Sequence, residues 1–227
     1  TLFRSLYGSF DYFYEKRNNI LTTYQSRPEW VGTTMAAGNL GETQNQGFEL
    51  ELHHSNTIGK DFRYNVGLSF SHAKNKIKNM DEPAGKTDYR KREGHAINQY
   101  FGLVCDGFVT AADLADPNGD GFIDGRDETF IGLSDIPENT YSLTLGATYK
   151  GWGFNVMFQG VDHVSRYYDA ESMYEFVNGG KVKSHHEGRW NPAMSEEWNL
   201  ANATYPLLHY DSNGNHNHQQ NSFFLKN

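Results

Sequence analysis

Two stretches of the chain, 46–55 and 61–73, alternate strictly between apolar and polar residues. Their apolar positions are Phe48, Leu50, Leu52, Phe62, Tyr64, Val66, Leu68 and Phe70. Because successive side chains of a strand point to opposite faces, each stretch predicts a strand with one apolar and one polar face. Glu49 and Glu51 lie on the polar face, which indicates that this face is in contact with water.

Four further segments are predicted as strands or as the start of one: 2–14, 140–149, 154–159 and 222–225. The connections alternate between long and short: 15–45, 56–60, 74–139, 150–153 and 161–221. In an antiparallel meander, successive connections lie at opposite ends of the sheet. We therefore expect both short turns at one end and all long loops at the other. A compact soluble domain seldom contains structureless connections above about 15 residues, whereas this asymmetry is typical of an outer-membrane β-barrel.

Composition narrows the class of protein further. The chain has 227 residues, a formal net charge of -8 and 15% aromatic residues, and the absence of Lys/Arg blocks argues against nucleic acid as a partner. The single cysteine, Cys105, excludes an internal disulfide framework and a cysteine zinc cluster. No nucleophile motif, phosphate loop or dinucleotide fingerprint is present, so we do not expect an enzyme. The chain starts inside a predicted strand without a signal peptide, and we expect it to be a piece of a longer polypeptide.

An aspartate-rich segment has the spacing of an EF-hand-type calcium loop. The candidate ligands are Asp116, Asn118, Asp120, the carbonyl of Phe122, Asp124 and Asp127, at positions one, three, five, seven, nine and twelve. Gly121 at position six permits the sharp turn, and hard cations prefer six to eight oxygen ligands. Asp127 replaces the usual glutamate. Because Asp, Asn and Gly are also the best turn formers, a structural Ca²⁺ site and a plain turn both remain open.

Two other groups of residues suggest catalysis or metal binding. Glu49 and Glu51 could be a glycosidase pair, but neighbours on one strand cannot flank a bond from two sides, so we interpret them as lining a hydrated lumen. Five histidines suggest a transition-metal site: His185, His186, His209, His216 and His218. They lie in Asn- and Gly-rich sequence without evident supporting residues, and we interpret them as solvated loop residues.

Aromatic residues gather in two places. Tyr149 and Trp152 flank a short turn and are interpreted as anchors at the periplasmic membrane interface. The long loop at 161–221 holds another group: Tyr167, Tyr168, Tyr174, Trp190 and Trp198. These rings could stack on sugars, pack against a partner protein or hold the loop together, and the sequence leaves these alternatives open.

Eight short segments resemble, in order, a known family. They are GETQNQGFEL at 41–50, NKI at 75–77, EGHAINQYFG at 93–102, DPNGDGFID at 116–124, IG at 131–132 with PE at 137–138, YKG at 149–151, FQG at 158–160 and RWNP at 189–192. The ordered set resembles the SusC/RagA family of TonB-dependent outer-membrane transporters. The resemblance implies an all-β fold, a fragment of a large antiparallel transmembrane β-barrel of the 22-stranded type with long extracellular loops. Residues 1–227 would form one partial barrel domain of about six strands, from the C-terminal third, with the plug domain absent.

The resemblance also implies a function and its partners. The expected activity is TonB-dependent import of oligosaccharides or peptides across the cell outer membrane. A SusD-like surface lipoprotein would act as a lid, the TonB complex would act through missing N-terminal parts, and outer-membrane lipid would surround the barrel. The alternative is a soluble surface domain that binds or degrades glycans. A barrel exposes a lipid-facing band, whereas a sandwich would bury the same residues between two sheets: Phe48, Leu50, Leu52, Phe62, Val66, Leu68, Leu143, Leu145, Phe154, Val156 and Phe158.

Overall fold

The computed structural model describes residues 5–26, 32, 36–105, 107–108, 125–168, 170–210 and 222–227. The chain divides into two compact units. The first consists of Thr1–Gln99 and Leu133–Val164 and contains the main sheet. The second consists of Tyr100–Gly132 and Ser165–Asn227 and is built from short elements. Each unit is described by itself below.

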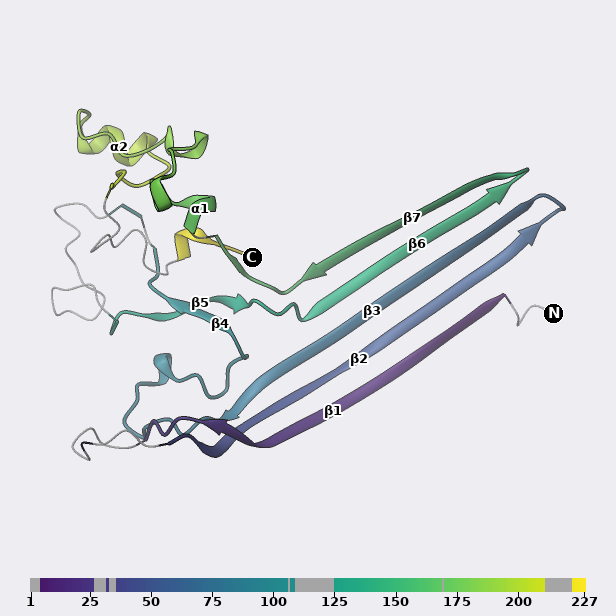
Figure 1. Ribbon diagram of the computed structural model, residues 1–227, viewed down its shortest axis with the longest axis horizontal. Coiled ribbons are helices and arrows are strands. Elements are labelled where there is room, and N and C mark those ends of the chain that lie inside the picture. Colours follow the sequence, from purple (N-terminus) through teal and green to yellow (C-terminus); the bar gives the residue numbers. More distant parts are fainter. Residues whose placement is uncertain are drawn as a thin grey trace. The chain divides into compact units, whose positions relative to one another are not determined.

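The first unit is dominated by one antiparallel sheet of five long strands in the order β1-β2-β3-β6-β7 (Figure 1). The strands are β1 (Leu6–Thr22), β2 (Gly38–Ile58), β3 (Phe62–Asn79), β6 (Asn139–Tyr149) and β7 (Trp152–Asp162). Every strand pairs with its predecessor in this order, so the sheet is a meander. The main sheet therefore has one strand fewer than the six that were expected.

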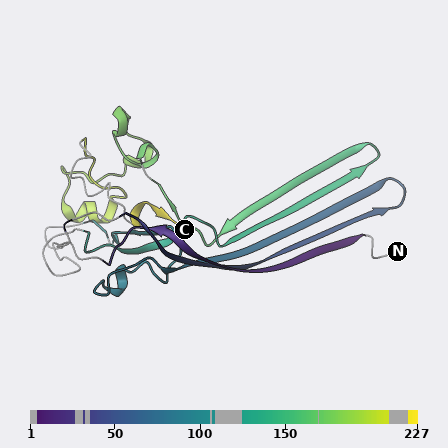
Figure 2. The same cartoon turned by 60° about the horizontal axis from the view of Figure 1, so that its bottom comes forward.

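The two tight turns lie at the same end of the sheet. Ile58 pairs with Phe62, Phe62 with Tyr149, and Tyr149 with Trp152, which places both reversals on one row. Figures 1 and 2 show the two turns together at the end of the sheet where β1 begins, with the remaining strand ends at the opposite end. Gly59 and Gly151 adopt φ of 68° and 87°, a left-handed conformation that glycine reaches without strain. The expected separation of short and long connections is confirmed.

The strands are longer than the sequence predicted. β1 continues to Thr22, β2 begins at Gly38 and β3 continues to Asn79, so the first long connection spans only 23–37. Most of the added residues are polar but keep pairing, as in Gln44 with Lys76. Backbone ladder bonds do not require apolar side chains, and the apolar alternation therefore marked only the middle of each strand.

One face of the sheet is apolar across all five strands. Paired residues share a face, and Leu52, Leu68, Leu143 and Phe158 form one continuous row. Leu52 and Leu68 are each 40% exposed, and Phe158 is 59% exposed. Within the described residues, no second sheet packs against this face. A sandwich would have buried this row, so the structure does not support the soluble alternative.

The second unit has its own small core. It contains the short strands β8 (Arg166–Tyr167) and β9 (Leu225–Lys226), which pair with each other, and the helices α1 (Ala170–Met173) and α2 (Glu196–Asn202). The side chains of Tyr174, Tyr205 and Phe224 are buried together.

The segment 222–225 was predicted to start a further strand, and the structure has a strand there only from Leu225. Ser222–Phe224 is a 3₁₀ turn, and the following β9 pairs with β8. The hydrophobic residues of this segment fill the core of the second unit.

Two more strands, β4 (Gln99–Gly102) and β5 (Thr129–Ser134), form a two-stranded sheet. The insertion predicted at 74–139 thus contains regular structure of its own. Among the described residues, no helix has both the length and the apolar composition needed to cross a membrane.

Candidate functional site

The polar face of the main sheet carries hydrogen-bonding side chains from every strand. One row across it reads Ser9, Glu51, Ser69, Ser142 and Gln159. The hydroxyls of Ser69 and Ser142 lie 2.8 Å apart, within hydrogen-bonding distance. In the adjacent row, the Ser71 hydroxyl donates to Glu49 Oε1 at 3.3 Å. Polar side chains that can form hydrogen bonds therefore extend across this face of the sheet.

Carboxylates concentrate on the β1–β2 part of this face. Asp11 pairs directly with Glu49, and Glu51 lies two residues further along the same strand. Like charges directly opposite each other are destabilising, and high-dielectric water reduces that cost. Both glutamates are exposed and project from the same side of one strand. The arrangement agrees with their interpretation as residues of a hydrated wall rather than as a catalytic pair.

The polar face also carries aromatic rings that the sequence analysis missed. The rings of Tyr7 and His53 stack with centroids 4.8 Å apart and planes 12° from parallel. The ring of Phe13 lies over Gly47, where a Cβ would meet it at 2.7 Å and would lie 2.0 Å from the carbonyl oxygen of His72. Such rings offer flat surfaces for stacking. The sequence already indicated these rings, since Tyr7 and Phe13 are large aromatic residues at positions that the alternation assigns to the polar face.

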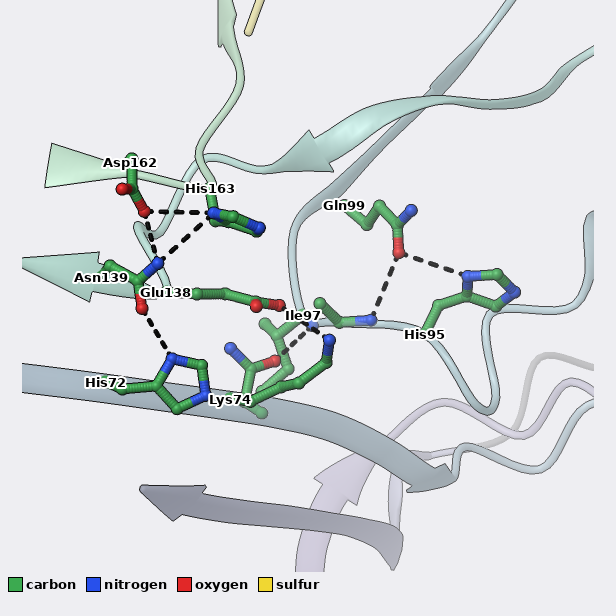
Figure 3. A network of polar contacts seen from close by, with 11 residues as sticks. His72, Lys74, His95, Ile97, Gln99, Glu138, Asn139, Asp162 and His163 are labelled. Carbon is green, nitrogen blue, oxygen red and sulfur yellow. Dashed lines mark hydrogen bonds and ion pairs between the residues drawn. The ribbon is translucent and has the colours of Figure 1, made fainter. Parts of the chain in front are cut away.

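At the long-loop end of the sheet, a polar network joins three strands (Figure 3). His72 Nδ1 of β3 donates to Asn139 Oδ1 of β6 at 2.6 Å. Asn139 Nδ2 donates in turn to Asp162 Oδ1 of β7, and His163 Nδ1 lies 3.1 Å from the same oxygen. The network holds together the strand ends from which the long connections leave.

A second set of contacts folds the chain after β3 back onto this end (Figure 3). The backbone N–H of Ile97 donates to Asn75 Oδ1 at 2.7 Å, and the Ser134 hydroxyl donates to the Ile97 carbonyl at 2.7 Å. Lys74 Nζ lies 3.3 Å from Glu138 Oε1. These bonds give residues 80–99, predicted as part of an irregular loop, a defined path.

Glu82 organises the turn that follows β3. Its carboxylate accepts hydrogen bonds from the backbone N–H groups of Arg92 at 3.0 Å and Glu93 at 3.1 Å, and from Lys86 Nζ at 2.5 Å. Burial raises the pKa of the Glu82 carboxyl, but these hydrogen bonds and the lysine charge outweigh burial and hold the pKa below its ordinary value. Glu82 is therefore ionised at neutral pH and fixes this segment.

Most of the predicted calcium loop lies outside the described residues. This applies to Asp116, Asn118, Asp120, Phe122 and Asp124, whereas Asp127 is described and precedes β5. In the part of the chain that the structure describes, no group of three or more His, Cys, Asp or Glu residues could hold a metal ion. The calcium site stays a prediction.

The interpretation of the histidines as solvated is wrong for His186, which is 1% exposed. Its Nδ1 accepts from the Lys183 backbone N–H at 2.9 Å, and its Nε2 donates to the Met173 carbonyl at 2.9 Å. His185 Nε2 lies 3.0 Å from the same carbonyl oxygen. These neighbouring imidazoles tie the chain after α1 to the rest of the second unit. His216 and His218 lie outside the described residues.

A buried carboxylate completes this core. Glu175 is buried and accepts hydrogen bonds from the Tyr205 hydroxyl and from the His209 backbone N–H, both at 2.9 Å. Burial and the bond to Glu175 raise the pKa of the Tyr205 phenol far above its ordinary value, so this hydroxyl stays a donor. The Tyr167 and Tyr174 hydroxyls lie 3.1 Å apart beside Phe224. Among the aromatic residues that the sequence singled out, these two hold the loop together.

Because of His186, we expect the stability of the second unit to depend on pH. Burial lowers its pKa from the ordinary value of 6.5, so the unfolded unit binds the proton more readily than the folded one. The stability that neutral His186 contributes is present above pH 6.5 and is lost as the pH falls towards the lower folded pKa. The charged groups nearest to it are Glu175, Lys183 and His185.

Hydrogen exchange of residues 173–210 in the full protein checks this expectation. Protection should fall on acidification in the wild type and change less in His186→Gln, since an amide can both accept from Lys183 and donate to Met173. An identical pH response in the two proteins would assign the effect to another group.

Comparison with known proteins identifies the family. The family described as TonB dependent receptor-like, β-barrel, matches residues 2–222. Two TonB-dependent receptors of Formosa agariphila are similar in sequence: P3 is 28% identical over 180 residues, or 66% of this chain, and P26 is 25% identical over 216 residues, or 82%. The chain covers 18% and 22% of these relatives, about a fifth of their length.

Solved structures show the same fold. A chain of the RagAB peptide importer matches 98% of this chain with a TM-score of 0.69 in its open-open state and 0.67 in its closed-closed state. The sequence identity is 18%, and the match covers 25% of that chain. The five-stranded sheet is thus an open piece of a larger barrel, as expected from the resemblance to SusC/RagA proteins. The chain belongs to the TonB-dependent receptor-like β-barrel family.

Proposed function

We propose that this chain forms part of the wall of an outer-membrane transporter that imports oligosaccharides or peptides in a TonB-dependent manner. The observation that carries the proposal is the two-faced sheet. Its apolar face is exposed and continuous across five strands, and its polar face is equally continuous. Lipid on one side and a water-filled lumen on the other satisfy both faces.

The height of the apolar face fits a membrane. From the row of Ile58 and Phe62 to the row of Phe48 it spans about 34 Å along the strands at a rise of about 3.4 Å per residue. A strand tilt of about 40° reduces this to a height of about 26 Å, close to the roughly 25 Å apolar band of outer-membrane barrels. On β2 the apolar face is interrupted by His54 and Asn56, which pair with Val66 and Tyr64 of β3. Tyr149 and Trp152 close the band at the short-turn end, and Trp152 is 83% exposed. This position supports their role as interface anchors.

The polar face supplies the groups that a polar substrate needs. Serine hydroxyls, exposed carboxylates and the Tyr7–His53 stack offer hydrogen bonds and a ring surface, which suit sugar hydroxyls and peptide amides alike. The similarity in fold to the RagAB peptide importer supports peptides as one substrate class. The exposed rings of Tyr168 and Trp198 in the second unit support stacking on sugars.

The partners follow from the same proposal. A SusD-like surface lipoprotein would cover the long-loop end as a lid, and the TonB complex would supply energy from the short-turn side. Ca²⁺ at Asp116, Asn118, Asp120, Phe122, Asp124 and Asp127 would rigidify an extracellular loop and take no part in chemistry. Extracellular calcium modules bind with dissociation constants of roughly 0.1–1 mM, so occupancy would follow the medium.

Uptake by cells that produce the full transporter tests the proposal. Labelled oligopeptide and labelled oligosaccharide are supplied separately, and accumulation is compared between cells with and without TonB. We expect accumulation of at least one substrate and its loss without TonB, at an unchanged amount of transporter in the outer membrane. Accumulation that persists in the absence of TonB would refute the proposed mechanism.

A further inference from the structure

The outward face of β1, β2 and β3 changes from apolar to basic near the long-loop end. Four successive cross-strand rows show the change: Phe10, Leu50 and Phe70; then Tyr12, Phe48 and His72; then Tyr14, Gln46 and Lys74; then Lys16, Gln44 and Lys76. The ladder has no register shift within these rows. The last two rows therefore lie on the same face as the apolar band and directly above it.

We call Lys16, Gln44, Gln46, Lys74 and Lys76 the lysine patch. Gln44 Nε2 donates to Gln46 Oε1 at 3.2 Å, so the amide NH₂ of Gln46 can still donate to an anion. Two of the lysines have acidic neighbours, Lys16 with Glu42 at 3.6 Å and Lys74 with Glu138 at 3.3 Å.

The charges of the lysine patch are only weakly neutralised. The Lys16–Glu42 pair is partly exposed on both sides, and such pairs contribute little energy that an anion would have to overcome. Lys74 is 61% exposed, although its partner Glu138 is only 17% exposed. Lys76 is exposed and forms no ion pair with any described residue. Three ammonium groups and an amide thus share one small outward surface.

The height of the lysine patch above the hydrocarbon edge determines whether its side chains reach the lipid headgroups. The hydrocarbon edge lies near the row of Phe48 and His72, where the apolar band ends. With a rise of about 3.4 Å and a tilt of about 40°, Lys74 starts about 5 Å above that edge, Lys76 about 10 Å and Lys78 about 16 Å. The headgroup layer is roughly 5–8 Å thick on each side of a bilayer. Lys74 and Lys76 can bend into it, whereas Lys78 lies beyond it.

We propose that the lysine patch binds the phosphate of an anionic lipid headgroup in the leaflet at the long-loop end. The inference rests on the proposed membrane location and adds a specific lipid contact to it. Amide and ammonium donors match phosphate oxygens, and the apolar rows below the patch hold the acyl chains of the same lipid. Because β1, β2 and β3 all contribute, the lipid would span three adjacent strands of the barrel wall.

The experiment measures retention of phosphatidylglycerol by the full transporter. The protein is inserted into vesicles of phosphatidylglycerol and phosphatidylcholine and extracted in mild detergent, and bound lipid is counted by native mass spectrometry. A basic side chain near an anionic surface contributes roughly a fivefold preference, so K74Q/K76Q should lower retention of phosphatidylglycerol about 25-fold. Phosphatidylcholine retention should not change. K60Q/K150Q removes two lysines from the short-turn end and is the matched control, and Lys78→Gln should behave like wild type.

The other possible outcomes would each contradict a particular part of the proposal. Equal retention by K74Q/K76Q and K60Q/K150Q would overturn the proposal, and displacement of the lipid by millimolar inorganic phosphate would show a free-anion site instead. A wild-type protein that fails to insert into either kind of vesicle would contradict the proposed membrane location itself. Insertion without lipid selectivity would refute only the lysine patch.

Discussion

Phe224→Ala is expected to open the second unit while leaving the main sheet paired. The Phe224 ring is 1% exposed and meets Tyr174 edge-on with centroids 5.0 Å apart, and Phe223 and Tyr205 contact its other sides. Removing a buried phenylalanine ring costs about 3–5 kcal/mol, because transfer energy is lost and a cavity remains. The second unit has few buried residues, so we expect a loss of stability of this size to unfold it.

Hydrogen exchange on the full protein measures the effect of Phe224→Ala. Amides of 165–210 should lose protection, and amides of β2 and β3 should keep theirs. Leu200→Ala on α2 is the control, since Leu200 is 49% exposed and its truncation removes little buried surface. Equal protection in Phe224→Ala and Leu200→Ala would show that the aromatic cluster does not hold the unit together.

Val156→Arg is expected to block insertion of the barrel into membranes. Val156 pairs with Leu145 in the middle of the apolar face. An arginine facing lipid near the bilayer midplane of a barrel costs about 2–4 kcal/mol. The fraction of full-length protein that inserts into phosphatidylcholine vesicles, read from its protection against protease, should fall accordingly.

The neighbouring residue supplies a matched control for Val156→Arg. Asn155 belongs to the same strand but lies on the polar face, where it pairs with Gly146. Asn155→Arg introduces the same side chain one residue away and should insert almost as well as wild type. Equal insertion of the two variants would mean that the apolar face does not meet lipid.

The middle of each strand was predictable because the signal is local. A period of two needs only adjacent residues, and the run from Phe62 to Phe70 shows it without tertiary information. Strand ends were not predictable, since Gln44, Lys74 and Lys76 pair through backbone bonds and have no apolar pattern. The same period places Tyr7 and Phe13 on the polar face, so these aromatic residues could have been assigned to the polar face from the sequence.

The second unit was hidden from the sequence for a different reason. Its core depends on pairs distant in the chain, such as Tyr205 with Glu175 and Phe224 with Tyr174. His186 lies in a stretch that has the composition of a polar loop, and its burial depends on the Met173 carbonyl, which only the fold brings next to it. Buried polar networks have no sequence period, so pattern analysis treats them as solvent-exposed.

The pairing of β3 with β6 has a consequence for how such proteins diversify. Residues 80–138 separate these two strands, yet their ladder runs from Phe62 with Tyr149 to His72 with Asn139 without a register shift. Closing a longer loop costs only about 0.6 kcal/mol for each doubling of its length. Insertions and deletions at this end can therefore accumulate while the strands keep their alignment, so that new recognition surfaces can evolve on an unchanged wall.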